Sequence, residues 1–254
     1  MRILVFDTSI PYTTAGWVHF AGPSADADIR DFAQLFLPAK PGHTETLLDR
    51  LDLVLRSGGL DLGQIDLLVH GRGPGTFTGL RIGFSTARAL HLAHNLPAVG
   101  VSTLRIAAAS ARHTGTVVSL IDARRNEVYC GAFAVSGQGD TAEVTPLMPE
   151  CVLPTTAVAQ HLDAADVPRP RFFTGDAAAL LPADNDNAPR DTRQSPQPFS
   201  VTWTARAGLA RFLAQGADDP HTTEPAYLRE PDARLPAQPL VIRDIAKPAS
   251  TTPK

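Results

Sequence analysis

The chain of 254 residues has few cysteines, no long apolar run and no excess of positive charge. The two cysteines, Cys130 and Cys151, are too few for a disulfide framework and are typical of a reducing compartment. No apolar run is long enough to span a bilayer. The apolar start of the chain meets Asp7 too early for a signal peptide. We therefore expect a cytoplasmic protein with no membrane contact.

The net charge of −3 and the pI of about 6.2 argue against a protein that binds nucleic acid alone. Such proteins usually carry a basic face. A subunit that works beside a basic partner is still compatible with this charge. Hydrophobic residues make up 43% of the chain, which is enough for one large domain or two smaller lobes.

The most informative stretch is the glycine-rich string GRGPGTFTGLRIG, from Gly71 to Gly83. An apolar strand precedes it and a helix is expected to follow it, so its backbone amides could hold an anion. The string is an incomplete phosphate loop, because Leu80 and Arg81 stand where Lys and then Ser or Thr are needed. A tight turn with close helix packing explains the glycines equally well.

Apolar segments with strand and helix patterns alternate along the first half, which predicts an α/β fold. Strands are expected at residues 3–6, 15–20, 29–37, 65–69, 98–101, 117–121, 127–135 and 171–174. Helices are expected at residues 44–57, 79–94, 102–111, 155–162 and 204–215. Residues 183–198 are rich in Asn, Asp, Pro and Gln, which predicts an exposed loop, and residues 247–254 are expected to be a disordered tail.

The second half opens in the same way as the first half. The strand at 3–6 ends in Asp7, and the strand at 117–121 ends in Asp122. Each aspartate is followed by a polar turn and a returning strand. The echo suggests a duplicated lobe, although aspartate commonly follows strands in unrelated proteins.

Several strings together resemble the TsaB family of bacterial tRNA-modification subunits. They occur in family order over nearly the whole chain, and residues 136–220 match poorly. The matching strings are RILVFDT (2–8), HTE (43–45), the glycine-rich string (71–83), GVSTL (100–104), DAR (122–124), EVY (127–129) and EPAYLR (224–229).

The resemblance implies the two-lobed actin, sugar-kinase and Hsp70 fold, in which each lobe opens with a β-hairpin on a mixed sheet flanked by helices. The lobes would span residues 1–107 and 108–232, with the helix near 204–215 free to pack back on the first lobe. Residues 233–254 would be mostly a flexible tail.

The implied function is a noncatalytic scaffold or activating subunit in the making of threonylcarbamoyladenosine on tRNA, at the adenosine beside the anticodon. Its partners would be the TsaD transferase in a heterodimer, the ATPase TsaE, and a second copy of itself when alone. It would reach tRNA only through the complex.

The family resemblance also predicts that this chain holds no metal and no cofactor of its own. TsaD holds its metal with histidines in a His-x-x-x-His motif just after the glycine-loop helix. The corresponding stretch here, 101–107, contains no histidine. We therefore expect no catalytic residue, with ATP and the metal bound by the partner subunits.

A weak, vestigial nucleotide site is implied where related kinases place their phosphate loops. In those proteins such carboxylates hold Mg²⁺ through water. The alternative is that Asp7 caps a turn which Thr8 and Ser9 satisfy. The residues implied in this site are Asp7, Thr8, Ser9, Gly73, Gly75 and Asp122.

The resemblance implies that the helices expected at 44–57 and 79–94 form the partner surface. They would pack in a four-helix bundle with the same two helices of TsaD or of a second copy. The apolar faces of these helices fit equally well between a sheet and a neighbouring helix. An aspartate at Phe84 or at Leu48 is expected to weaken association more than folding. The partner-binding residues are predicted to be Leu47, Leu48, Leu51, Leu55, Leu80, Arg81, Phe84 and Arg88.

Two other functions fit the same fold. A small-molecule or acyl kinase would use Asp7 and Asp122 around MgATP and would turn over ATP without a partner. A metallopeptidase would hold zinc or iron and lose activity with a chelator.

Overall fold

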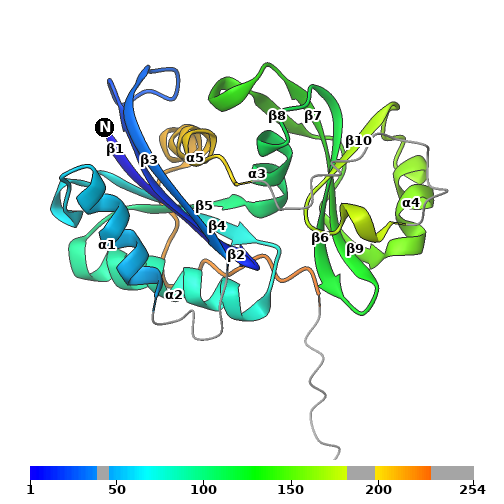
Figure 1. Cartoon of the computed structure of the whole chain (residues 1–254), viewed down its shortest axis with the longest axis horizontal. Coiled ribbons are helices and arrows are strands. Elements are labelled where there is room, and N and C mark those ends of the chain that lie inside the picture. Colours follow the sequence, from blue (N-terminus) through cyan, green and yellow to red (C-terminus); the bar gives the residue numbers. More distant parts are fainter. Residues whose placement is uncertain (39–45, 182–197, 230–254) are drawn as a thin grey trace, which may run out of the picture.

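Two mixed β-sheets, both flanked by helices, make up the protein (Figure 1). The structure is a computed structural model that describes residues 1–38, 46–181 and 198–229. The strands are β1 (Arg2–Ile10), β2 (Tyr12–Phe20), β3 (Ile29–Pro38), β4 (Leu67–Gly73), β5 (Ala98–Ser102), β6 (Gly115–Arg124), β7 (Glu127–Ser136), β8 (Glu143–Pro146), β9 (Cys151–Pro154) and β10 (Arg171–Thr174). The α-helices are α1 (Leu47–Ser57), α2 (Phe77–His94), α3 (Thr103–Ser110), α4 (Val158–Ala164) and α5 (Val201–Gln215). Short 3-10 turns are η2 (Leu62–Gln64), η3 (Gly139–Thr141), η4 (Thr155–Ala157) and η5 (Ala178–Leu180).

The first sheet has the strand order β3-β2-β1-β4-β5. Strand β1 pairs antiparallel with β2 and parallel with β4, and Phe6 lies beside His70. Strand β1 is buried along almost its whole length, which agrees with its apolar sequence. The parallel pairing brings the end of β1, at Asp7, next to the end of β4, where the glycine-rich string begins.

The second sheet repeats the pairing of the first sheet. Strand β6 pairs antiparallel with β7 and parallel with β10, while both β8 and β9 pair with the far side of β7. Both sheets therefore open with an antiparallel hairpin, as the echo in the sequence predicted. The turn between β6 and β7 holds Arg124, Arg125 and Asn126 at positive φ.

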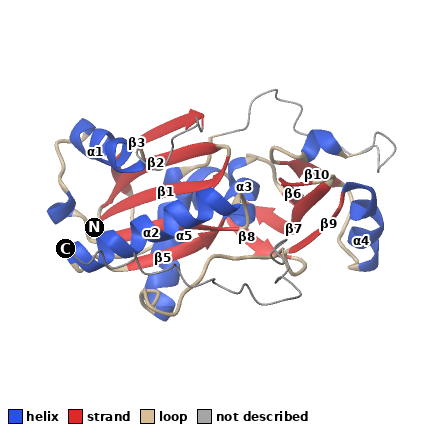
Figure 2. Cartoon of the chain, turned by 90° about the horizontal axis from the view of Figure 1, so that it is seen from below, coloured by secondary structure: helices blue, strands red, loops and turns tan. Residues whose placement is uncertain are grey.

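The helices and sheets alternate in layers. Helices α1 and α2 cover one face of the first sheet, and α5 covers its other face. Helix α3 packs on β6, β7 and β8 of the second sheet, and α4 lies on that sheet's outer face (Figure 2). No described helix is long and apolar enough to cross a membrane.

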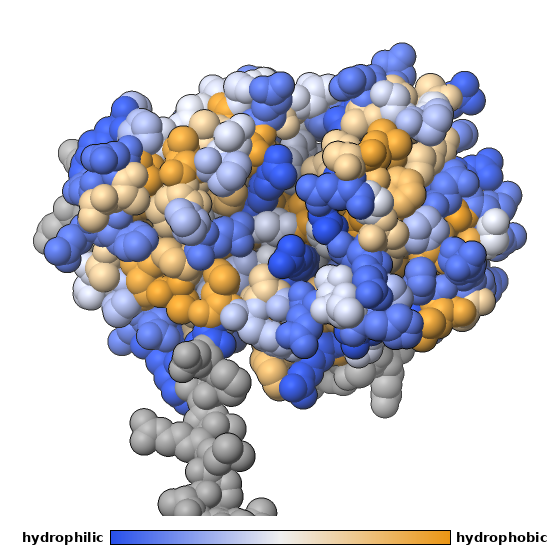
Figure 3. Space-filling model, turned by 180° about the vertical axis from the view of Figure 1, so that it is seen from behind, coloured by the Kyte–Doolittle hydropathy of each residue, from blue (hydrophilic) through white to orange (hydrophobic). Residues whose placement is uncertain are grey.

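Hydrophobic side chains also reach the surface. Figure 3 shows them gathered in patches that hydrophilic side chains separate. Isolated exposed apolar side chains are normal in folded proteins. A patch on this protein therefore marks a partner site only where other features, such as a groove, support it.

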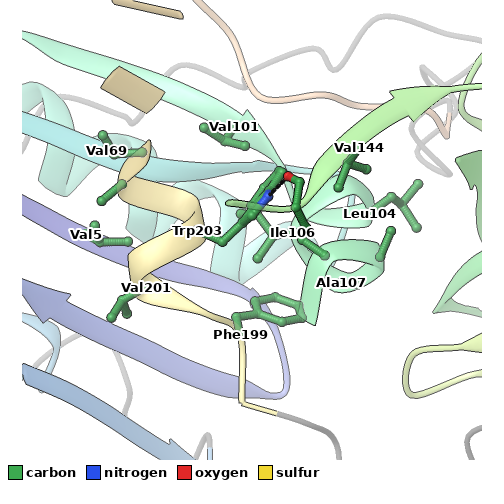
Figure 4. Close-up of a cluster of buried hydrophobic side chains, with 14 of the residues drawn as sticks. Val5, Val69, Val101, Leu104, Ile106, Ala107, Val144, Phe199, Val201 and Trp203 are labelled. Atoms are coloured by element: carbon green, nitrogen blue, oxygen red, sulfur yellow. Dashed lines mark hydrogen bonds between the residues drawn. The ribbon is translucent and has the colours of Figure 1, made fainter. Parts of the chain in front are cut away.

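Residues from both sheets share one hydrophobic core (Figure 4). Trp203 of α5 lies at its centre and donates an Nε1 hydrogen bond of 2.8 Å to the carbonyl of Ala142, before β8. Val5 and Val69 enter this core from the first sheet, and Val144 enters it from the second. The Trp203 indole thus links α5, which covers the first sheet, to the residue that precedes β8 of the second sheet.

The sequence predicted the main elements well. Strand β10 has the predicted bounds, and the expected Ser102 cap of α3 is present, since its Oγ accepts from the Arg105 amide at 3.3 Å. The short strands β8 and β9 were not predicted. The predicted lobe boundary at 107/108 falls inside α3, and the two-lobe division stays a prediction. Both the predicted tail at 233–254 and nearly all of the predicted loop at 183–198 lie outside the described residues.

Helix α5 approaches the first sheet so closely that one glycine is required. A Cβ on Gly208 would collide with the Cγ atoms of Val69 on β4. Gly208→Ala should therefore destabilise the chain by about 1–3 kcal/mol through overpacking, despite the better helix propensity of alanine. Urea unfolding measures this change. Gly22→Ala, where a Cβ would meet nothing within 4 Å, is the matched control and should change stability by less than about 0.5 kcal/mol.

Candidate functional site

The glycine-rich string joins β4 to α2 and lies against the end of β1. A Cβ on Gly71 would collide with the Asp7 carboxylate, and one on Gly75 would collide with the Ser9 carbonyl. A Cβ on Gly79 would collide with the Thr8 carbonyl. Gly75 and Gly79 are therefore required by the close approach of two backbones, and Gly71 by the approach of the Asp7 side chain, which is the packing explanation of the string.

Asp7 lies under this string and is almost completely buried. Its Oδ1 accepts from the Ser9 amide at 2.6 Å, and its Oδ2 accepts from the Thr103 hydroxyl at 3.0 Å. Burial raises the pKa of the Asp7 carboxyl, and the hydrogen bonds from Ser9 and Thr103 offset part of that rise. The Thr103 Oγ1 also accepts from the Gly73 amide at 3.2 Å, so it joins Asp7 to the string.

Several amides at the junction between the string and α2 have acceptors within the chain. The Thr76 amide donates to the Ser9 carbonyl at 2.7 Å, and the Gly79 amide donates to the Thr76 hydroxyl at 3.3 Å. The Leu80 amide donates to the Thr76 carbonyl, which is the first bond of the helix. The Thr8 hydroxyl donates to the Gly79 carbonyl at 2.7 Å.

The expected nucleotide site stays a prediction, and these contacts bear on it. The Asp7 carboxylate and the Thr8 hydroxyl are bound inside the chain, and Ser9 is buried. Such contacts are those of the alternative, in which Asp7 caps a turn at the end of β1.

Gly75 and Asp122 both line a pocket of about 780 Å³ that lies between α2 and the β6–β7 hairpin. The C-terminal segment 226–229 forms its third wall. Gly73 lies just behind it, where a Cβ would contact Leu80. The aromatic residues Phe77, Tyr129 and Tyr227 line the pocket, together with three arginines, Arg81, Arg124 and Arg229.

The charged groups of this pocket have partners within the chain. Asp122 forms an ion pair of 3.1 Å with Arg124 and donates its amide to Asp176 Oδ1 at 3.1 Å. Arg229 pairs with Glu127 at 3.3 Å and donates to the Ala123 carbonyl at 2.7 Å. The guanidinium of Arg81 lies 3.8 Å from the centre of the Phe77 ring, at the pocket wall.

A second hollow, of about 620 Å³, lies between α1 and α2. Its floor is apolar, with Leu51, Leu55 and Leu90, and its rim holds Asp52, Arg56 and His94. Leu48 projects from α1 at its side and is 58% exposed. We call this hollow the α1–α2 groove.

The structure divides the eight predicted partner-binding residues into two sets. Leu48, Arg81 and Arg88 are exposed, and Arg88 donates to the Thr223 carbonyl at 2.9 Å. The other five, Leu47, Leu51, Leu55, Leu80 and Phe84, are buried in this chain.

The expectation for Phe84 needs correction on physical grounds. Its ring packs edge-on against the buried His70 imidazole, with 4.8 Å between ring centres. An aspartate there would bury an unpaired charge. Phe84→Asp is therefore expected to disrupt folding, whereas Leu48→Asp is not.

The stretch 101–107, where the resemblance implies the missing histidines, runs from the end of β5 into α3. Its polar side chains are engaged: Thr103 with Asp7, and Ser102 in a short hydrogen bond with the Glu150 carboxylate. Burial raises the pKa of Glu150. Among the described residues, no group of three or more His, Cys, Asp or Glu side chains is placed to hold a metal ion.

A family model described as TsaD, tRNA N6-adenosine threonylcarbamoyltransferase, matches residues 38–181, which is more than half of the chain. The chain belongs to this family. Its curated relatives confirm the resemblance to the TsaB members. The tRNA threonylcarbamoyladenosine biosynthesis protein TsaB of Haemophilus influenzae is 43% identical over 94 residues, 36% of this chain and 40% of that protein. The Escherichia coli protein of the same name is 46% identical over 90 residues, 34% of this chain and 39% of that protein.

These matches to TsaB proteins span only about two fifths of the length of either relative. A solved structure extends the likeness to nearly the whole chain. An uncharacterized Pseudomonas aeruginosa protein with similarity to peptidase YEAZ has a TM-score of 0.72 and 28% identity, and the alignment covers 90% of this chain and 99% of that one. The TsaB-type arrangement is therefore not confined to the matched segment.

Sequence reasoning missed Thr103 and the aromatic walls of the pocket. Thr103, Tyr129 and Tyr227 all lie within the strings that carry the family resemblance. Those strings are distant in sequence and meet only because β5, β7 and the 226–229 segment converge beside α2. The strings therefore held a signal for these residues, but not for their contacts.

The burial of Asp7 predicts a particular dependence of stability on pH. Because its pKa is raised above 3.8, the folded chain keeps this proton where the unfolded chain has lost it. The stabilising contribution is full below about pH 3.8 and is lost as the pH rises through the folded pKa. Asp7→Asn cannot titrate, so its free energy of unfolding relative to the wild type should rise between about pH 4 and pH 7.

Urea unfolding at several pH values measures this difference. Asp49→Asn, an exposed carboxylate on α1, is the matched control for the loss of one charge. A difference for Asp7→Asn that falls as the pH rises would contradict the assignment.

Proposed function

We propose that the chain is a noncatalytic scaffold or activating subunit of a complex that makes threonylcarbamoyladenosine on tRNA, at the adenosine next to the anticodon. The main support for this proposal is that the Asp7 carboxylate is buried and hydrogen-bonded within the chain. The carboxylate that a related kinase would use is hydrogen-bonded to Ser9 and Thr103 beneath the glycine-rich string. The product, threonylcarbamoyladenosine on tRNA, is inferred from the names of the curated TsaB relatives.

The two-lobed actin, sugar-kinase and Hsp70 fold is part of the proposal. The repeated pairing of β1 with β2 and β4, and of β6 with β7 and β10, supports it. In this fold, the pocket beside Gly75 and Asp122 corresponds to the nucleotide cleft. Because its charged groups already pair within the chain, we propose at most weak nucleotide binding and no cofactor of the chain's own.

The partner surface is proposed to be the α1–α2 groove. It combines an apolar floor with a charged rim, which is the usual composition of a protein interface. Its occupant is proposed to be the matching helices of TsaD, or of a second copy when TsaD is absent. TsaE would join the complex, tRNA would be reached through TsaD, and the protein would work in the cytoplasm.

The kinase alternative has less support than the scaffold. A kinase would need Asp7 and Asp122 on either side of one bound metal–nucleotide complex. Asp122 faces the pocket, whereas Asp7 lies behind the glycine-rich string. The metallopeptidase alternative lacks a suitable ligand cluster in the described part of the chain.

Reconstitution tests the proposal directly. The chain should be purified alone, mixed with TsaD, and mixed with TsaD and TsaE, and each sample assayed for metal content, ATP hydrolysis and tRNA modification. Modification is expected only in the mixtures with TsaD and not in the sample of the chain alone. ATP turnover by the chain alone would favour the kinase, and bound zinc or iron with chelator-sensitive peptidase activity would favour the third function.

Two leucines on α1 test the α1–α2 groove. Leu48 and Leu53 are both 58% exposed, but only Leu48 lines the groove. Leu48→Asp should raise the Kd for TsaD by more than about tenfold, because it places a charge in an apolar contact. Leu53→Asp is the matched control and should bind normally.

Calorimetry or surface plasmon resonance measures both constants, after circular dichroism has confirmed that each variant is folded. Equal affinities for the two variants would show that the partner binds elsewhere.

A further inference from the structure

The two cysteines lie directly opposite each other on neighbouring antiparallel strands. Cys130 of β7 is in register with Cys151 of β9, and both pack in the cluster beneath α4. The Cys151 Sγ lies 3.9 Å from the Cys130 carbonyl oxygen, and both thiols are free. Cys130 is fully buried and Cys151 is partly exposed. The pair therefore has one thiol that reagents can reach and one that they cannot.

A histidine stands beside the accessible thiol. His161 of α4 places its Nε2 3.6 Å from the Cys151 Sγ. A hydrogen bond between the two thiols lowers the pKa of Cys151 and raises that of Cys130. Cys151 thus combines exposure, a neighbouring base and a bias toward the thiolate, which are the features of reactive cysteines.

We propose that Cys151 is a thiol–disulfide exchange site for small-molecule disulfides such as glutathione disulfide, and that Cys130 resolves the adduct into an intramolecular bond. The proposal does not depend on the function proposed above. It assigns a chemistry to two residues that play no part in either hollow.

The exchange proceeds in two balanced steps. In the first, the Cys151 proton passes to His161 Nε2 and then to solvent, and the thiolate attacks glutathione disulfide. A Cys151–glutathione bond forms, the original S–S bond breaks, and one glutathione thiolate leaves. In the second, the Cys130 sulfur attacks the Cys151 Sγ, the Cys151–glutathione bond breaks, and the Cys130 proton passes to the departing glutathione sulfur, which leaves as the second glutathione thiol. The two cysteines lose two electrons, and glutathione disulfide gains them.

The geometry of opposed strand positions permits the product bond. Opposed residues have Cα atoms about 4.5–5.5 Å apart, within the range of about 4.4–6.8 Å that a disulfide spans. Their Cβ atoms lie about 4.5–5.5 Å apart, whereas a disulfide needs about 3.8 Å. The bond therefore needs a small movement of β9 toward β7, and excess thiol reverses it by the same exchange.

Intact mass spectrometry of the full chain tests the proposal. The reduced protein is incubated with glutathione disulfide, quenched with acid, alkylated and digested. The expected product has lost both free thiols, retains no glutathione, is monomeric on a non-reducing gel, and yields a peptide that links positions 130 and 151. Glutathione at millimolar concentration should then restore both thiols.

Single variants separate the two roles. Cys130→Ala should retain one glutathione per chain, and Cys151→Ala should remain unmodified. His161→Gln should slow the first step by about threefold or more, while the exposed His221→Gln control reacts at the wild-type rate. Wild-type chain that retains glutathione, uptake by Cys151→Ala in its folded state, or a disulfide-linked dimer as main product would overturn the proposal. An unchanged rate for His161→Gln would overturn the role of that histidine. If a variant fails to fold, the wild-type product alone decides the question.

Discussion

The close approach of the glycine-rich string to the end of β1 is the constraint on which the site depends. Gly75 and Gly79 let one backbone lie directly on another, Gly71 leaves room for the Asp7 carboxylate, and Thr103 joins the two segments through hydrogen bonds with Asp7 and Gly73. This contact fixes where α2 begins. The start of α2 in turn places Phe77 and Arg81 at the pocket. A larger residue at Gly71, Gly75 or Gly79 would have to move β1, which is buried on both faces, so the site cannot adjust locally.

The same contact encloses a carboxylate that a phosphate loop would leave open to a ligand. In a working phosphate loop the amides and carboxylates face a ligand. Here they face one another, and burial of Asp7 makes its ionised form costly. The surface features available for recognition are then the α1–α2 groove and the aromatic pocket. This division between an enclosed interior and a structured exterior is what a docking subunit needs.

The sequence predicted the order of strands and helices because their apolar periods and glycine or proline ends are local signals. It could not predict which side of α1 faces the sheet: Leu47, Leu51 and Leu55 pack inward, whereas Leu48 stays outside. It left the glycines ambiguous because their partner, β1, lies about sixty residues earlier in the chain. Strands β8 and β9 were missed because each has four residues and ends in proline, whereas β10, of the same length, carries two adjacent phenylalanines. Side-chain contacts such as Thr103 with Asp7 are set by tertiary packing alone.

The Trp203 cluster has a mechanical consequence. Enzymes that close around a nucleotide need a hinge whose opening exposes little apolar surface. In this chain, Val5 and Val69 from one sheet and Val144 from the other pack around a single indole that is bonded to Ala142. Swinging the sheets apart would expose that whole cluster to water at about 25 cal/mol for every Å². A relative movement of the two sheets is therefore costly wherever it would open this cluster to water.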